Sequence, residues 1–365
     1  MILNKKILFI VEKQAQAQII QKLKVFEELS LNNEINFHYA HCIVPYYSYK
    51  YPNNLKYKDL PFICDLLYKL DIEDYNKKYP LKVSKETPYY LSYHNLNKEF
   101  FLNYDKIVFA TEQEGTRCYG AYLELEQVLG KDFKKSFETI HSISTNKLDE
   151  ESLTHEINNS LNNEIFNNQR VNEFYKFVNK GKIKRYFDYN YQFNCNVFIK
   201  ELYKYLFLKD FKDNQEFEET YSKYGFTKYM LLTMLSYKKH LETNEKEYFY
   251  ENEIEKYLYK YGGTGKYKNK YFIGLGSPAS RAQIIINLIN LKIINEINLN
   301  NKKTLKFNEK VDNMIMLLNK KIFDPDLPFR IEEWRNLDFE IAKEKIDKYI
   351  KEIFIKQKVK NKFIK

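Results

Sequence analysis

The stretch Lys106-Ile-Val-Phe-Ala-Thr-Glu-Gln-Glu114 decides how this chain is expected to fold. A short apolar run, Ile107 to Ala110, ends in two carboxylates at alternate positions, Glu112 and Glu114. Alternate residues of an extended segment point to the same side, so both acids can face one point just past the strand. Clustered carboxylates are costly without a cation between them, and Mg²⁺ takes oxygen ligands of this kind. Taken alone, the stretch is more simply a solvated loop with two surface acids.

A second apolar run, near the amino terminus, ends in the same way. The run from Lys6 to Val11 leads into Glu12 and Lys13, and a helical pattern follows up to Leu23. Open α/β sheets build their sites from buried strands that end in such groups and lead into helices. The two runs together therefore favour a shared site over a solvated loop.

Composition indicates a globular protein with a polyanionic partner. The chain has 365 residues, a length that allows two or three domains with a real core. Its hydrophobic content of 44% is typical of a globular protein. Lysine and arginine total 59 against 49 acidic residues, giving a net charge of +10. That balance suits nucleic acid as a partner, although it bears on steering and solubility rather than on fold.

Neither the cysteines nor the apolar runs indicate an exported or membrane protein. The four cysteines are scattered without a C-x-x-C pair, which argues against zinc ribbons and disulfide frameworks. The first apolar run is closed by Glu12 and Lys13, too early for a signal peptide, and no run is long enough to span a membrane. We expect a cytoplasmic protein without membrane association.

The order of patterns predicts two parts. Strand and helix patterns alternate up to residue 145 and predict an α/β domain with a mostly parallel sheet and flanking helices. From 146 to the end the chain is expected to be almost wholly helical. Helices are predicted over residues 150–162, 169–178, 197–210, 227–241, 251–260, 278–291, 309–320 and 340–357.

The most specific string is Gly274-Leu-Gly-Ser-Pro-Ala-Ser-Arg-Ala282. Gly276 allows a sharp turn, and Ser277 can cap a helix that begins at the following proline. Free amides at a helix start, two hydroxyls (Ser277 and Ser280) and Arg281 are well suited to hold a phosphate. Without further context, a capped helix is the simpler interpretation.

These strings together resemble type IA DNA topoisomerases, in particular the topoisomerase III branch. The Toprim domain of that family opens with a strand ending in Glu-Lys, as at Glu12-Lys13. Its acidic motif, Ala-Thr-Asp-x-Asp-Arg-Glu-Gly-Glu, is similar to Ala110-Thr-Glu-Gln-Glu-Gly-Thr-Arg-Cys118. Its Leu-Gly-Thr-Pro-Ala-Thr-Arg-Ala string is similar to Leu275 to Ala282. The resemblance covers residues 1–195 and 225–355.

The resemblance implies a Toprim-like α/β domain over 1–145. It also implies a Mg²⁺ site, weakened by the departures described next, whose ligands are Glu12, Glu112 and Glu114. Glu12 and Lys13 would be the residual catalytic residues, with Lys13 as phosphate contact or acid.

Over 146–365 the resemblance implies a helical domain like the central DNA-binding region of the family. Single-stranded DNA would then bind between the Toprim and helical domains. The implied DNA contacts are Ser277, Ser280, Arg281 and Arg170.

Several departures from the family pattern concern catalysis directly. Both acids of the Asp pair are glutamates here, the third acid falls on Thr116, and the next glutamate falls on Cys118. The Tyr-x-Arg-Thr motif that carries the family's nucleophile does not occur in the sequence. Only residues 196–225 stand in place of the tyrosine-bearing gate domain, which is too short a segment for such a gate.

We therefore expect a shortened, topoisomerase III-like protein that binds single-stranded DNA and has lost strand passage. One alternative is an active topoisomerase that uses Tyr221, Tyr224 or a tyrosine of a partner chain. A second is a Mg²⁺-dependent Toprim nuclease that works through activated water. A third is a non-catalytic protein that docks on a replication, recombination or mobile-element factor.

Overall fold

The computed structural model describes residues 5–39, 55–65, 98–130, 133–137, 139–262, 267, 274–276, 278–299 and 301–362, with the backbone alone at 134, 278 and 279. The chain divides into two compact units. The α/β unit comprises Met1–Asn53 and Asp65–Arg185, and the helical unit comprises Asn54–Cys64 and Tyr186–Lys365. The predicted functional domains, 1–145 and 146–365, stay a prediction.

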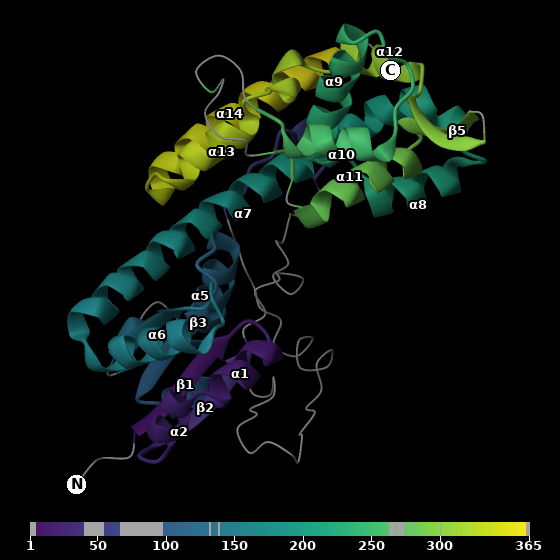
Figure 1. The fold of residues 1–365 in the computed structure, drawn as a ribbon. Coiled ribbons are helices and arrows are strands. Elements are labelled where there is room, and N and C mark those ends of the chain that lie inside the picture. The colour runs from purple at the N-terminus through teal and green to yellow at the C-terminus, as the bar shows by residue number, and fades with distance from the viewer. Residues whose placement is uncertain are drawn as a thin grey trace. The chain divides into compact units, whose positions relative to one another are not determined.

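A parallel sheet forms the centre of the α/β unit (Figure 1). Within the described residues it has four strands in the order β2-β1-β3-β4, and every neighbouring pair is parallel. The strands are β1 (Lys5–Val11), β2 (Asn33–Tyr39), β3 (Lys106–Thr111) and β4 (Thr139–Ser144). The apolar runs of β1 and β3 are buried on both faces, as is usual for the middle strands of a parallel sheet. The predicted α/β fold with a mostly parallel sheet is confirmed.

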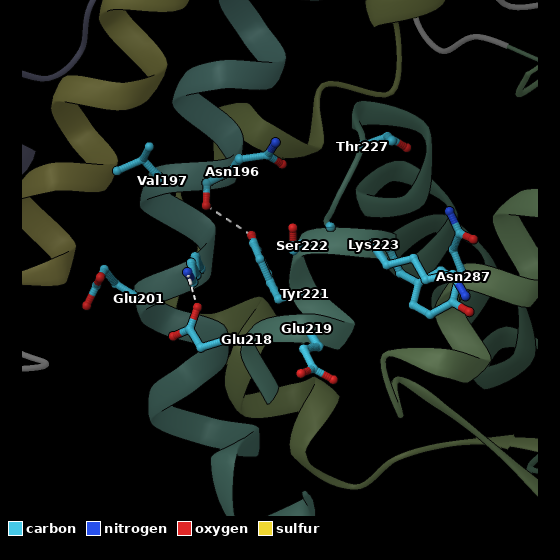
Figure 2. Close-up of a pocket in the computed structure, with 13 residues that line it drawn as sticks. Asn196, Val197, Glu201, Glu218, Glu219, Tyr221, Ser222, Lys223, Thr227 and Asn287 are labelled. Atoms are coloured by element: carbon cyan, nitrogen blue, oxygen red, sulfur yellow. Dashed lines mark hydrogen bonds and ion pairs between the residues drawn. The ribbon is translucent and has the colours of Figure 1, made fainter. Parts of the chain in front are cut away.

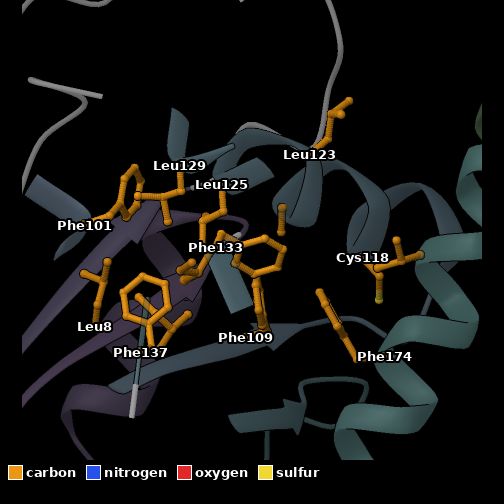
Figure 3. Packing of buried hydrophobic residues seen from close by; sticks show 14 of the residues in the cluster. Leu8, Phe101, Phe109, Cys118, Leu123, Leu125, Leu129, Phe133, Phe137 and Phe174 are labelled. Carbon is orange, nitrogen blue, oxygen red and sulfur yellow. The ribbon is translucent and has the colours of Figure 1, made fainter. Parts of the chain in front are cut away.

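Helices cover both faces of this sheet. Successive side chains of β1 point to opposite sides, so Leu8 and Phe9 pack in different apolar clusters. Phe9 packs in one apolar cluster with residues of α1 (Gln14–Gln21), α2 (Lys24–Ser30) and α6 (Glu150–Asn162). Leu8 packs in a second cluster with residues of α4 (Lys98–Leu102) and α5 (Gly115–Leu129), seen in Figure 3. There the ring of Phe109 stacks on Phe174 with centroids 4.2 Å apart. The short turn η2 (Phe133–Lys135) follows α5.

The longest helix, α7 (Glu164–Phe207), contributes to both units: residues up to Arg185 belong to the α/β unit and the rest to the helical unit. In the α/β unit, Gly181 packs directly on Gly115, the first residue of α5. A Cβ atom at 181 would lie 1.9 Å from the Gly115 carbonyl oxygen. Only glycine allows the two backbones to approach this closely, so the start of α5 is fixed against α7.

The helical unit consists mainly of helices, and several of them begin at a side-chain cap, such as Asp213, Thr227 and Asp338. After α7 come η3 (Leu208–Asp210), α8 (Asn214–Tyr224), α9 (Lys228–Thr243), α10 (Glu251–Tyr259), α11 (Pro278–Asn290), α12 (Lys310–Leu317), η5 (Lys320–Phe323), α13 (Leu327–Arg335) and α14 (Phe339–Asn361). An antiparallel hairpin, β5 (Ile294–Leu299) and β6 (Lys302–Phe307), interrupts the helices. The mainly helical remainder was predicted, and the hairpin was not.

A short early segment of the chain, residues 55–64 with the turn η1 (Tyr57–Asp59), belongs to the helical unit. Two asparagines on consecutive turns of α7 hold it by paired hydrogen bonds. Asn194 accepts from the Phe62 N–H at 2.9 Å and donates to the Phe62 carbonyl at 2.7 Å. Asn190 does the same with Cys64, at 2.9 and 3.1 Å. The two side chains thus pair with the backbone N–H and carbonyl groups of this segment as a neighbouring strand would.

No helix within the described ranges combines the length and the apolar character needed to cross a bilayer.

Candidate functional site

Glu12 and Glu112 meet at the carboxyl ends of two neighbouring parallel strands. Glu12 directly follows β1 and Glu112 directly follows β3, in a register that pairs Val11 with Ala110. Glu12 Oε1 accepts a hydrogen bond of 2.7 Å from the Glu112 N–H. The structure therefore brings these two predicted acids together. With Glu114 they are called the acidic edge below.

The Glu114 side chain caps the helix that follows it. It is the N-cap of α5, and its Oε2 atom accepts from the amides of Thr116 at 2.9 Å and Arg117 at 3.2 Å. These are amides that a helix leaves without an intrahelical partner. The carboxylate that was predicted as a metal ligand therefore stabilises the start of α5.

Arg117 supplies a positive charge to the acidic edge. Its Nε atom lies 3.4 Å from Glu12 Oε2, and the Glu12 side chain is 0% exposed. Burial raises the pKa of Glu12, and the nearby Glu112 carboxylate raises it further. The hydrogen bond from the Glu112 N–H and the charge of Arg117 oppose this rise. Lys13, the other predicted catalytic residue, has an exposed side chain.

As they lie, these side chains do not fit a Mg²⁺ ion. Glu12 faces an amide and a guanidinium, and Glu114 faces helix amides. In the described part of the chain no three His, Cys, Asp or Glu side chains are grouped so as to hold a metal. Cys118, where the family has glutamate, is buried, and burial raises the pKa of its thiol to about 12, so it stays neutral. The predicted Mg²⁺ site stays a prediction.

Side-chain amides that sequence reasoning missed organise the rest of this edge. Gln16 accepts from the N–H groups of Glu12 at 2.9 Å and Lys13 at 3.2 Å, and its amide donates to Thr145 Oγ1 at 3.3 Å. The Gln113 N–H donates to Asn146 Oδ1 at 2.8 Å. Gln113, Thr145 and Asn146 lie just after β3 and β4, and Gln16 lies in the first turn of α1, the helix that follows β1. Polar residues at the ends of parallel strands were the signal that could have found them.

Arg170, a predicted DNA contact, is engaged within the α/β unit. Its guanidinium forms a bidentate pair with Glu156 of α6 and donates to Glu173 at 2.8 Å. Glu173 also accepts from the Gln113 side chain at 3.1 Å. Arg170 thus links α6 and α7 to the loop between β3 and α5. Its role in binding DNA stays a prediction.

The Gly274–Arg281 string forms a tight corner before α11. Gly274 and Gly276 have φ angles of +71° and +77°, a region that favours glycine. Each glycine also makes room for a side chain further along. A Cβ at 274 would lie 2.7 Å from Arg281 Nη2, and one at 276 would lie 2.6 Å from Ser280 Oγ. Ser277, the third predicted DNA contact here, lies outside the described residues.

Arg281 is buried in this corner, with 8% of its surface exposed. Its guanidinium carbon lies 5.2 Å from the ring centroid of Tyr259, which is 62% exposed. Nothing among the described residues accepts a hydrogen bond from the buried Arg281 Nε. A guanidinium in this condition retains donor capacity that an anion could use.

Residues 196–225, which the resemblance predicts to replace a gate domain, form the end of α7, η3 and α8. A pocket lies over them, lined among others by Asn196, Glu218, Tyr221 and Lys223. Figure 2 shows the Tyr221 hydroxyl directed at Asn196, whose carbonyl accepts its hydrogen bond at 3.1 Å. Burial raises the Tyr221 pKa well above its usual value. Tyr224 is half-buried beside Lys223, whose Nζ lies 4.9 Å from its ring centroid.

Comparisons with family models, with curated proteins and with solved structures found no match to this chain. The resemblance to type IA topoisomerases therefore depends on the quoted motifs alone.

Proposed function

We propose that the chain is a single-stranded DNA-binding protein of the type IA topoisomerase kind, with a Toprim-like α/β domain, in which strand passage is lost. The observation that carries the proposal is the corner around Arg281 in the helical unit. There a buried guanidinium without a hydrogen bond on Nε lies beside an exposed tyrosine ring.

Phosphate is the ligand that suits Arg281. Leaving a buried donor unsatisfied costs about 1–3 kcal/mol, and a phosphate oxygen would remove that cost. The first turn of α11 adds the positive end of the helix dipole. The net charge of +10 supports a polyanion over a single phosphate ion.

Tyr259 makes a nucleic-acid strand a better candidate than a phosphorylated small molecule. Its ring is exposed next to the guanidinium, so a base could stack on it while the neighbouring phosphate meets Arg281. Stacking on an aromatic ring contributes about 1–3 kcal/mol per base in single-strand sites. A duplex hides its base faces, whereas an unpaired strand offers a base face and a phosphate together, and the net charge of +10 favours a strand over a free nucleotide.

The loss of strand passage is proposed from the nucleophile. The sequence lacks the Tyr-x-Arg-Thr motif. Tyr221 is 5% exposed and its hydroxyl already donates to a carbonyl, so it is not placed to attack a phosphate. The topoisomerase alternative would therefore need Tyr224 or a tyrosine from a partner chain.

Two further alternatives are separated from DNA binding by simple outcomes. Metal-dependent cleavage of DNA would favour the Toprim nuclease. A protein that docks on a replication, recombination or mobile-element factor would bind that factor without binding DNA.

The deciding experiment is fluorescence anisotropy with a labelled oligonucleotide, comparing Arg281→Ala with the unaltered chain. We expect weaker binding for all sequences alike and a salt dependence that is flatter by about one unit. Arg330→Ala is the matched control, because Arg330 also lies in the helical unit but its Nε donates to Asp324 Oδ2 at 2.7 Å. Unchanged affinity in a folded Arg281→Ala protein, judged by its melting temperature, would defeat the proposal.

A further inference from the structure

The acidic edge has its own cation. Arg117 reaches from the first turn of α5 to within 3.4 Å of Glu12 Oε2, and the Glu12 side chain is fully buried. Oε2 accepts no hydrogen bond from the described residues, so the charge of Arg117 is its direct partner. Lys13 adds a weaker attraction from an exposed position.

The acidic edge brings two acids together and buries one of them. Glu12 and Glu112 directly follow neighbouring parallel strands, and the Glu12 side chain is 0% exposed. The backbone cannot move the two acids apart, since Glu12 also holds the Glu112 N–H and the strands are paired in register. A positive charge beside a buried carboxylate offsets the cost of its burial, and either a guanidinium or a metal ion could provide it.

We infer that the Arg117 guanidinium takes the place of a divalent cation at the acidic edge. The unaltered chain keeps Glu12 and Glu112 together without metal, and a cation site opens when Arg117 is replaced by a neutral side chain. A metal ion and the guanidinium exclude each other, because two cations at such a distance repel strongly in a buried site. The inference does not depend on DNA binding.

The test uses Mn²⁺ as the probe, with binding to the full chain followed by calorimetry and by electron paramagnetic resonance. We expect Arg117→Gln to bind Mn²⁺ roughly tenfold or more tightly than the unaltered chain. Mn²⁺ should also raise the melting temperature of Arg117→Gln but not that of the unaltered chain. Arg117→Lys keeps the positive charge and should bind no better than the unaltered chain. Adding Glu12→Gln to Arg117→Gln should abolish the gain.

Three results would overturn the inference. One is Mn²⁺ binding by the unaltered chain that is as tight as binding by Arg117→Gln and is lost with Glu12→Gln. Another is a folded Arg117→Gln protein that gains no Mn²⁺ binding. The third is an Arg117→Gln protein that is unfolded with and without Mn²⁺, because the metal then cannot replace the guanidinium. An Arg117→Gln protein that folds only with Mn²⁺ would support the inference.

Discussion

Gly181 of α7 and Gly115 of α5 lie so close that no side-chain atom fits between them. The 1.9 Å separating a Cβ at 181 from the Gly115 carbonyl oxygen is far inside van der Waals contact. The atom it would meet belongs to the backbone, so no side-chain rotation can relieve the overlap. This contact fixes the turn of helix that carries both the Glu114 cap and Arg117.

Gly181→Ala should therefore destabilise the protein. A helical glycine replaced by alanine normally gains up to about 1 kcal/mol, but overpacking of this kind costs about 1–3 kcal/mol or more. We expect a net loss of unfolding free energy in urea denaturation. Gly262→Ala is the control, since a Cβ there meets nothing within 4 Å and should change stability by less than about 0.5 kcal/mol. A more stable Gly181→Ala protein would contradict the contact.

The buried His141 should make stability fall in mild acid. Its Nδ1 donates to the Ser160 carbonyl at 2.8 Å, and burial lowers its pKa to about 4. Between pH 6.5 and pH 4 the unfolded chain binds a proton that the folded chain does not, so unfolding free energy falls as pH falls through this window. The full effect is about 3 kcal/mol.

Measuring urea denaturation between pH 5 and 6.5 limits the contribution of carboxylates, whose ordinary pKa values are about 4. In that range His141→Asn should flatten the dependence of stability on pH. An equal slope in both proteins would show that His141 is protonated alike in the folded and unfolded states.

Gly274→Ala should lower DNA affinity although no charged residue is replaced. The new Cβ would lie 2.7 Å from Arg281 Nη2, so the guanidinium would have to move. Affinity in anisotropy titrations should fall in the same direction as for Arg281→Ala. Gly130→Ala is the matched control: φ is +78°, yet nothing lies within 4 Å of its Cβ. Both variants lose about 1–2 kcal/mol of stability to backbone strain. Gly274→Ala should lose more, because its Cβ also lies 3.1 Å from the Leu258 carbonyl oxygen, and it alone should bind DNA more weakly.

The purified chain should not relax supercoiled DNA in the presence of Mg²⁺. Tyr221→Phe should cost about 1 kcal/mol of stability, because the Asn196 carbonyl loses its donor. DNA affinity in the folded variant should be unchanged. Relaxation activity in a gel assay that disappears with Tyr221→Phe would show that Tyr221 is a nucleophile after all.

The meeting of Glu12 and Glu112 could be predicted because it follows from strand order alone. Two apolar runs that become neighbouring parallel strands end at the same edge of the sheet, whatever their loops do. The role of Glu114 could not be predicted in this way. An acid that stands between a strand and a helix can face a metal or cap the helix, and the sequence is the same in both cases.

Arg117 and the hairpin were missed for different physical reasons. The reach of Arg117 to Glu12 depends on the angle at which α5 leaves the strand, which periodicity does not contain. The hairpin at 294–307 is rich in isoleucine, leucine, asparagine and lysine, and such a composition fits helices as well as strands. Asn301 in its turn has a φ angle of +61°. Asparagine tolerates this conformation, but the presence of an asparagine does not by itself predict a turn.

The paired hydrogen bonds between Asn194 and Phe62 constrain the order in which parts of the protein can fold during synthesis. The two residues are 132 positions apart in the chain. At a synthesis rate of about 5–20 residues per second, Phe62 leaves the ribosome about 7 to 26 s before its partner. Throughout that interval the N–H and carbonyl groups of residues 62 and 64 must be satisfied by water. The helical unit can therefore be completed only after much of the α/β unit has already emerged.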